Sequence, residues 1–233
     1  AGDRLYLIPT QDNDLFLKNN VDYRRDIKAD NTVRTRDLYL MNYLSIYLIY
    51  LFFSGEGSDP QCREFCRVAE KWHGFDDDRI KIDGGIHAPY TSNAQLWEGI
   101  SDYCREQQLG VQLHLAQTRE EEEESLDRTG LGSGELLNCH RFFDIPATAA
   151  GCNALSDEER AMLGKKKVSC VATPVCDAKN GVSVTPIAKT VKAGMNVCLG
   201  TGGAAECGNL DMFGVMRQAA LQERLAAGDA DKM

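Results

Sequence analysis

From residue 45 onward, short apolar runs alternate with longer amphipathic stretches. The apolar runs are typical of buried strands and predict strands at 45–53, 79–86, 111–115, 147–151, 168–173 and 196–200. The stretches between them have apolar residues at helical spacing and predict helices at 60–72, 93–108, 119–128, 156–165, 186–193 and 210–227. Strands that alternate with helices at this spacing predict βαβ units and a parallel sheet, so the fold class is α/β.

The boundaries of one predicted helix are especially well marked. Ser156 is placed to cap its first turn, and Glu159, three residues later, completes the pattern of a capping box. Gly164 stands where the same helix is expected to end. Six βα units of this kind suit either an open doubly wound sheet or most of an eight-unit barrel, and the pattern alone leaves both architectures open.

The first part of the chain has a weaker pattern. Residues 1–44 carry mixed charge and little periodicity, so we divide the chain into an N-terminal segment, 1–44, and a barrel portion, 45–233. The apolar run at 38–53 is shorter than a bilayer span and is interrupted by Asn42 and Ser45, which favours a buried segment over a membrane helix. No secretory signal opens the sequence, and we expect a cytoplasmic protein.

Composition and charge narrow the classes of partner. The chain has 233 residues, 43% of them hydrophobic and 26% charged, with a net charge of −9. This excess of acidic residues argues against nucleic acid or an anionic membrane as the main partner, because both are bound through Lys and Arg. Nine cysteines at irregular spacing indicate reduced thiols. Cys62 and Cys66 lie one helical turn apart, but no second Cys or His pair is near them, so packing is favoured over metal binding.

Several polar or small residues fall at the carboxyl ends of predicted strands, where ligands bind in parallel α/β folds. These residues are His87, His114, Gln117, Gly151, Thr173 and the turn 201–203. The other two histidines, His73 and His140, fall in or beside helices and are expected at the surface. A simpler interpretation is that His87 and His114 are core residues bonded to the backbone, and that Gln117 precedes an ordinary helix start.

The glycine-rich turn within 198–213 raises the question of phosphate binding. No Lys follows it, as a P-loop requires, and its Gly-x-Gly spacing lacks the third glycine and the βαβ unit of a dinucleotide site. Phosphate binding is therefore a weak hypothesis.

A set of separate blocks occurs in a recognisable order between 78 and 228: IHAPYTSN, LHLAQTREEEEES, ATAAGCNALSDEER, VSCVATPV and AGMNVCLGTGGAAECGNLDMF. In this order they resemble the amidohydrolase superfamily, in particular the S-adenosylhomocysteine and 5'-methylthioadenosine deaminases with related chlorohydrolases. The resemblance implies a (β/α)8 TIM-type barrel with one divalent metal, usually zinc. It also implies that metal-activated water attacks the ring carbon that bears the amino group of an adenosine-like substrate, releasing ammonia.

The family's site residues transfer to this sequence only in part. By resemblance, His114 is a metal ligand and His87 contacts the substrate. Gln117 stands in place of the proton-shuttling Glu, Gly151 in place of a His, and Gly202 in place of the metal-binding Asp. The His-x-His metal pair of the family's first strand occurs nowhere in the chain. A Gln side chain cannot exchange a proton at neutral pH, and a catalytic zinc uses three protein ligands.

These departures leave two hypotheses for function. One is a zinc-dependent hydrolytic deaminase of an adenosine-like thioether nucleoside. The other is a catalytically degenerate barrel with no bound metal, which binds a nucleoside or a partner protein. The six units match the third to eighth of the family, so we expect an incomplete barrel with its first two strands unidentified and without the C-terminal β domain. A second copy, a partner chain or the N-terminal segment is expected to cover the open edge.

Overall fold

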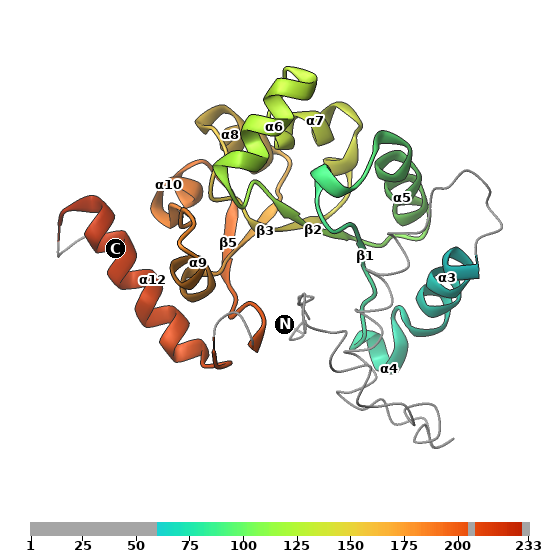
Figure 1. The fold of residues 1–233 in the computed structure, drawn as a ribbon. Helices are drawn as coiled ribbons and strands as arrows, with labels where there is room; N and C mark the ends of the chain where they lie inside the picture. Colours follow the sequence, from blue (N-terminus) through green and yellow to red (C-terminus); the bar gives the residue numbers. More distant parts are fainter. Residues whose placement is uncertain (1–59, 205–207, 230–233) are drawn as a thin grey trace.

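The computed structural model describes residues 60–204 and 208–229 (Figure 1). Its centre is a parallel sheet of five strands in the order β1-β2-β3-β4-β5. The strands are β1 Gly84–Gly85, β2 Val111–Leu115, β3 Ala147–Gly151, β4 Ser169–Ala172 and β5 Asn196–Leu199. Among these five described strands, each pairs with the next along the chain and the order does not reverse, as in a barrel and unlike a doubly wound sheet. The fold is α/β, a partial barrel of consecutive βα units, as predicted.

Helices connect the strands and cover one face of the sheet. The described helices are α3 Pro60–Trp72, α4 Phe75–Asp78, α5 Ala94–Glu106, α6 Arg119–Thr129, α7 Ser133–Cys139, α8 Asp157–Lys165, α9 Pro174–Asn180, α10 Ile187–Lys192 and α12 Met212–Ala227. Two short 3-10 turns, η2 Pro89–Thr91 and η3 Phe142–Asp144, follow β1 and precede β3. Helices α5 to α8 and α10 lie together along one side of the sheet (Figure 1).

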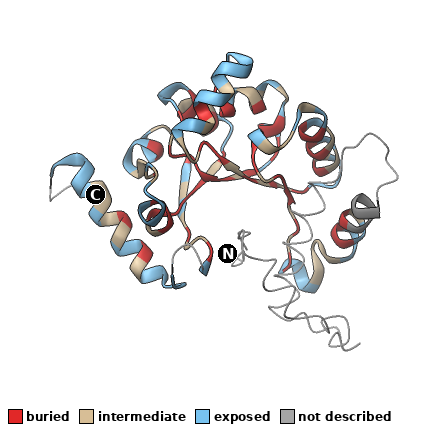
Figure 2. Cartoon of the chain, in the orientation of Figure 1, coloured by how far each residue is buried: buried red, intermediate tan, exposed pale blue. Residues whose placement is uncertain are grey.

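The two faces of β2 differ in burial, and this difference places the core. Val111, Leu113 and Leu115 are buried, whereas Gln112 and His114 between them are half-buried. Buried residues gather along the sheet and on the inward sides of the helices that cover it (Figure 2). β3 has four Ala or Gly residues among its five, and such small side chains let neighbouring elements approach closely. The apolar face of the sheet therefore packs on the helices and the half-buried polar residues lie on its other face.

Most predicted elements are confirmed. β2 and β3 have the predicted bounds, β4 and β5 lie within theirs, and the predicted helices agree with α3, α5, α6, α8, α10 and α12 to within two residues at each end. The capping box at Ser156 and Glu159 is present. Helices α7 and α9 were not predicted. The predicted strand at 45–53 and the division at 44/45 lie outside the described residues.

β1 is much shorter than the predicted strand at 79–86. Within the described part of the chain, the residues before it bond to a preceding turn. The N–H of Gly74 donates to Ile80 O at 2.8 Å, and the N–H of Ile82 donates to Nδ1 of His73 at 3.1 Å. Ile80 and Ile82 are buried, as the apolar alternation predicts. The hydrogen-bond partner of the Ile82 N–H, however, is a histidine side chain.

At the other edge of the sheet, β5 is the most exposed strand. Its Asn196 and Cys198 side chains are exposed, and on its outer side no further strand pairs with it within the part of the chain that the structure describes. Among the described helices, none combines the length and the apolar character needed to cross a membrane.

Candidate functional site

The parallel strands bring their carboxyl ends to one edge of the sheet, and the predicted site residues lie along it. His87 follows β1, His114 lies in β2, and Gly151 ends β3. Leu115 pairs with Gly151 in the register of β2 and β3, which brings Gln117, just past the end of β2, beside β3. Gly202 follows β5, at the far side of the sheet from β1 and β2. The structure therefore groups four of the five residues directly.

His114 is held by the backbone of His87. The carbonyl oxygen of His87 accepts two hydrogen bonds, one from the His114 N–H at 2.8 Å and one from His114 Nδ1 at 3.0 Å. A carbonyl oxygen only accepts, so Nδ1 of His114 carries a proton. A backbone acceptor on one ring nitrogen is also the arrangement that orients a histidine for metal binding through the other.

His87 is oriented in a similar way by Thr91. The Thr91 hydroxyl donates to Ala88 O at 3.1 Å, so it accepts from Nδ1 of His87, also at 3.1 Å. The imidazole rings of His87 and His114 lie 5.2 Å apart, centre to centre. Burial lowers the pKa of His87 below its usual value, and the neighbouring His114 lowers it further. His87 is therefore neutral at pH 7, with its lone pair on Nε2.

Gln117 and Gly151 are packed against each other. Gly151 has φ +96°, and a Cβ at this position would stand 2.7 Å from Cγ of Gln117 and 3.0 Å from Leu115 O. The backbone N–H of Gln117 donates to Glu121 Oε2 at 3.1 Å. Residue 151 therefore has no room for a side chain in this conformation, and Gln117 lies over the place where one would be.

Sequence reasoning missed a group of polar residues that tie the strand ends together. Asn153 donates through Nδ2 to Gln117 O at 3.1 Å. The Thr185 hydroxyl lies 2.6 Å from Asn153 Oδ1 and 2.8 Å from Gly151 O. Asn153 and Thr185 are buried. Asn153 lies two residues beyond a predicted strand end, and that position was the available signal.

Beneath them lies a buried arginine. Arg160 of α8 is 2% exposed, and Nη1 donates to Cys152 O at 2.8 Å and to Thr190 Oγ1 at 2.9 Å, while Nη2 donates to Asn153 O at 3.1 Å. Arg160 thus holds the backbone just past β3 and links it to α10. A buried guanidinium that donates to backbone carbonyls fixes the loop geometry at this edge.

The remaining predicted residues have local roles. Gly202 adopts φ +68°, a left-handed conformation that favours glycine. The Thr173 hydroxyl donates to Asp177 Oδ1 at 3.2 Å, within the first turn of α9. His73 bonds the backbone of Ile82, and Nδ1 of His140 lies 2.8 Å from Glu98 Oε1. His73 and His140 are both half-buried, and each is held by one of these contacts.

The described strand-end residues supply fewer ligands than a catalytic zinc needs. All four histidines of the chain lie in the described residues, and only His87 and His114 are close together at the strand ends. Within 60–204 and 208–229, no group of three His, Cys, Asp or Glu side chains could hold a metal ion. A catalytic zinc needs three protein ligands and an open position for water. Two imidazoles fall short of that number.

The chain belongs to the amidohydrolase family, whose pattern matches residues 31–233. It is 35% identical over 158 residues to the 5-methylthioadenosine/S-adenosylhomocysteine deaminase of Thermoanaerobacter pseudethanolicus. The matched region covers 68% of this chain and 37% of that protein. It is also 32% identical over 174 residues to the 5'-deoxyadenosine deaminase of Methanothermobacter thermautotrophicus, and this match covers 75% of this chain and 41% of that protein. The chain thus spans less than half the length of these relatives. The resemblance inferred from the ordered blocks is confirmed.

Solved structures agree with the fold. An adenosine deaminase from Xanthomonas campestris with bound zinc superimposes with a TM-score of 0.71 at 23% identity, covering 83% of this chain and 45% of that one. A guanine deaminase from C. acetobutylicum with bound guanine gives a TM-score of 0.66 at 21% identity, covering 74% and 42%. Both are similar to the partial barrel described above.

Proposed function

We propose that this chain is the barrel portion of an adenosine-deaminase-type amidohydrolase whose strand-end site binds an adenosine-like thioether nucleoside without hydrolysing it. The observation that carries the proposal is the pair of imidazoles, His87 and His114, beside Gln117 and Gly151, which has no side chain. The names of the relatives supply the substrate class, S-adenosylhomocysteine, 5'-methylthioadenosine or 5'-deoxyadenosine.

The chemistry of these side chains suits recognition of adenine. The unprotonated Nε2 of His87 accepts hydrogen bonds, and the exocyclic amino group of adenine donates them. The amide of Gln117 offers one donor and one acceptor group, a combination that pairs with the adjacent acceptor and donor on an adenine edge. The site therefore has the polarity of an adenine-binding surface.

The same side chains are poorly suited to hydrolysis. Hydrolytic deamination needs a water that loses a proton and a leaving nitrogen that gains one. Gln117 can do neither at neutral pH, and loss of general acid-base catalysis alone lowers a rate by roughly 100 to 10,000-fold. Zinc, when held by a complete ligand set, supplies an activated water, but the described residues supply two imidazoles and no third ligand.

Calorimetric titration of the purified chain with S-adenosylhomocysteine, 5'-methylthioadenosine and adenosine tests the proposal, together with zinc analysis and an assay for released ammonia. We expect binding without turnover, with or without added zinc. Inosine should bind at least tenfold more weakly, because its exocyclic carbonyl oxygen at C6 places an acceptor where adenine offers a donor to Nε2 of His87. His114→Ala should weaken binding, while His140→Ala, at a helix end away from the strand edge, should not. Stoichiometric zinc with turnover would show that the chain is a deaminase after all.

A further inference from the structure

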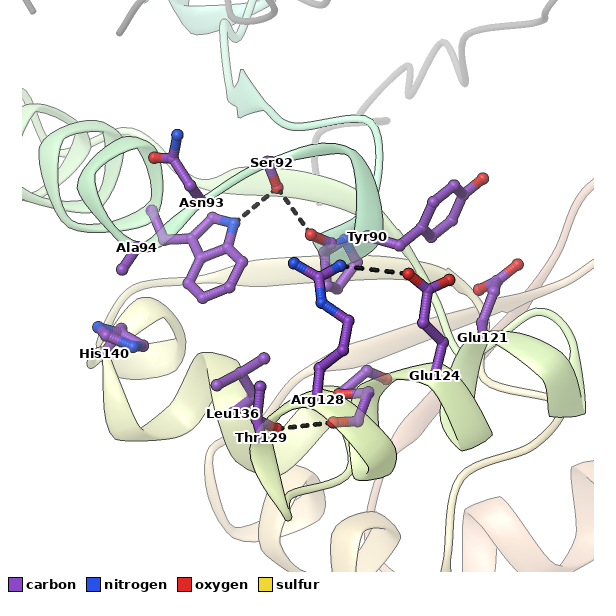
Figure 3. A pocket seen from close by; sticks show the side chains of 14 residues that line it. Tyr90, Ser92, Asn93, Ala94, Glu121, Glu124, Arg128, Thr129, Leu136 and His140 are labelled. Carbon is purple, nitrogen blue, oxygen red and sulfur yellow. Dashed lines mark hydrogen bonds and ion pairs between the residues drawn. The ribbon is translucent and has the colours of Figure 1, made fainter.

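A cavity lies outside the strand-end site, between α5, α6 and α7 (Figure 3). Its volume is about 290 Å³, near the lower end of the range for small-molecule sites. Its walls combine apolar and aromatic side chains with a few charged ones, as ligand cavities do; those used below are Tyr90, Trp97, Glu121, Glu124, Arg128 and Leu136. None of the proposed adenine-binding side chains lines it.

The indole of Trp97 gives the cavity a rigid aromatic wall. Its Nε1–H donates to Ser92 Oγ at 2.6 Å, and Ser92 Oγ in turn donates to Ala88 O at 2.7 Å. The His140 ring packs edge-on against the indole, with the ring centres 5.3 Å apart. Trp97 is 5% exposed, so the ring is held in place and a ligand would meet it without a change of rotamer.

The charges around the cavity are not balanced. Nη1 of Arg128 lies 3.2 Å from Glu124 Oε1, so these two side chains compensate each other. Glu121 accepts a hydrogen bond from the Gln117 N–H, but no Lys or Arg of the described residues forms an ion pair with it. Burial raises the pKa of the Glu121 carboxyl, and the nearby Glu122 and Glu120 raise it further. The cavity thus contains one carboxylate that a cation would stabilise.

We propose that this cavity binds a small organic ammonium compound with an aromatic body, of the arylalkylamine class. The ammonium pairs with Glu121, and the aromatic body packs against Trp97 and Leu136. A carboxylate ligand fits less well, because Glu124 already neutralises Arg128 and Glu121 repels a second negative charge. The proposal does not rest on the nucleoside site.

Phenethylamine is a suitable probe, and the indole N–H signals in a ¹H–¹⁵N spectrum report on its binding. The chain has two tryptophans, Trp97 in the cavity and Trp72 on α3, where it packs against Phe75. We expect the Trp97 signal to shift in a saturable manner while the Trp72 signal stays fixed. Glu121→Gln keeps an oxygen for the Gln117 N–H but removes the charge, and should weaken binding at least tenfold.

The matched control is Glu120→Gln. Glu120 is the preceding residue, is exposed and does not line the cavity, so this variant removes the same charge from the same helical turn and should change the affinity less than twofold. The uncharged analogue ethylbenzene and the anion 3-phenylpropionate should each bind at least tenfold more weakly than phenethylamine. The proposal is overturned if phenethylamine leaves the Trp97 signal unmoved, if both Glu variants weaken it equally, or if 3-phenylpropionate binds as tightly.

Discussion

The side chain of Gln117 lies across the Cα of Gly151, so close that a Cβ on Gly151 would stand 2.7 Å from Cγ of Gln117. Both residues occupy positions where the resemblance implies an acid and an imidazole. In this structure Gln117 lies in the space that a side chain at residue 151 would need.

Gly151→Ala should lower the free energy of unfolding by about 1 to 3 kcal/mol, because φ +96° is strained for any residue with a Cβ. Urea unfolding measures the change. The double variant Gln117→Ala/Gly151→Ala should recover only part of the loss, since Leu115 O remains 3.0 Å from the new Cβ. Full recovery would mean that Gln117 alone, and not the backbone, excludes a side chain there.

Restoring the family residues should not restore a metal centre. In the triple variant Gly202→Asp, Gly151→His, Gln117→Glu, the new His must enter space bounded by residue 117 and Leu115 O, and the His-x-His pair is still missing. We expect no tight zinc binding and no deamination, measured by zinc analysis and ammonia release. Tight zinc binding with turnover would show that other groups complete the ligand set.

The pKa of His87 in the folded protein should be below 6.5, as followed by the His Cε1–H signals in an NMR titration. Since burial is the larger cause, His114→Asn should raise this pKa only in part. The unfolded chain then binds the proton more readily than the folded one, so between the folded pKa and about 6.5 stability falls as the pH is lowered. A pKa at or above 6.5 would contradict this assignment of a neutral imidazole.

Arg160→Met should destabilise the fold by about 2 to 5 kcal/mol, because it leaves the Cys152 and Asn153 carbonyls buried without a donor. The control is Arg105→Met, whose guanidinium pairs with Asp102 one turn away on the outside of α5, and which should change stability by less than about 1 kcal/mol. If the two variants lowered the free energy of unfolding equally in urea, the hydrogen bonds of Arg160 to the Cys152 and Asn153 carbonyls would not be important for stability.

The sequence allowed the regular parts of the fold to be predicted, because burial on one face gives a clear period. β2 and β3 are examples, since their apolar runs end at polar or glycine residues. The pattern overstated β1, because Ile80 and Ile82 are buried like strand residues while their backbone bonds to His73 and Gly74. Helix α9 begins at Pro174 and follows Thr173 in the N-cap position, a pair typical of a helix start. In the sequence this pair was interpreted only as the end of a strand.

The position of the candidate site could be predicted from the sequence, but the buried polar residues that hold its backbone in place could not. His87 and His114 fall at strand ends, so the parallel sheet brings them together. The roles of Asn153, Thr185 and Arg160 depend on contacts between residues 7 to 36 positions apart, which no local pattern records. The tight contact between Gln117 and Gly151 likewise appears only once the strands are in register.

The two hydrogen bonds that orient His114 both end on the carbonyl oxygen of His87, so the pairing of two strands sets the direction of this ring. No ligand is needed to hold it. A protein of this fold can therefore exchange the residues around the ring and still hold the imidazole in the same orientation at the strand edge. An imidazole oriented by the sheet itself is a starting point from which a new binding specificity can evolve through few substitutions.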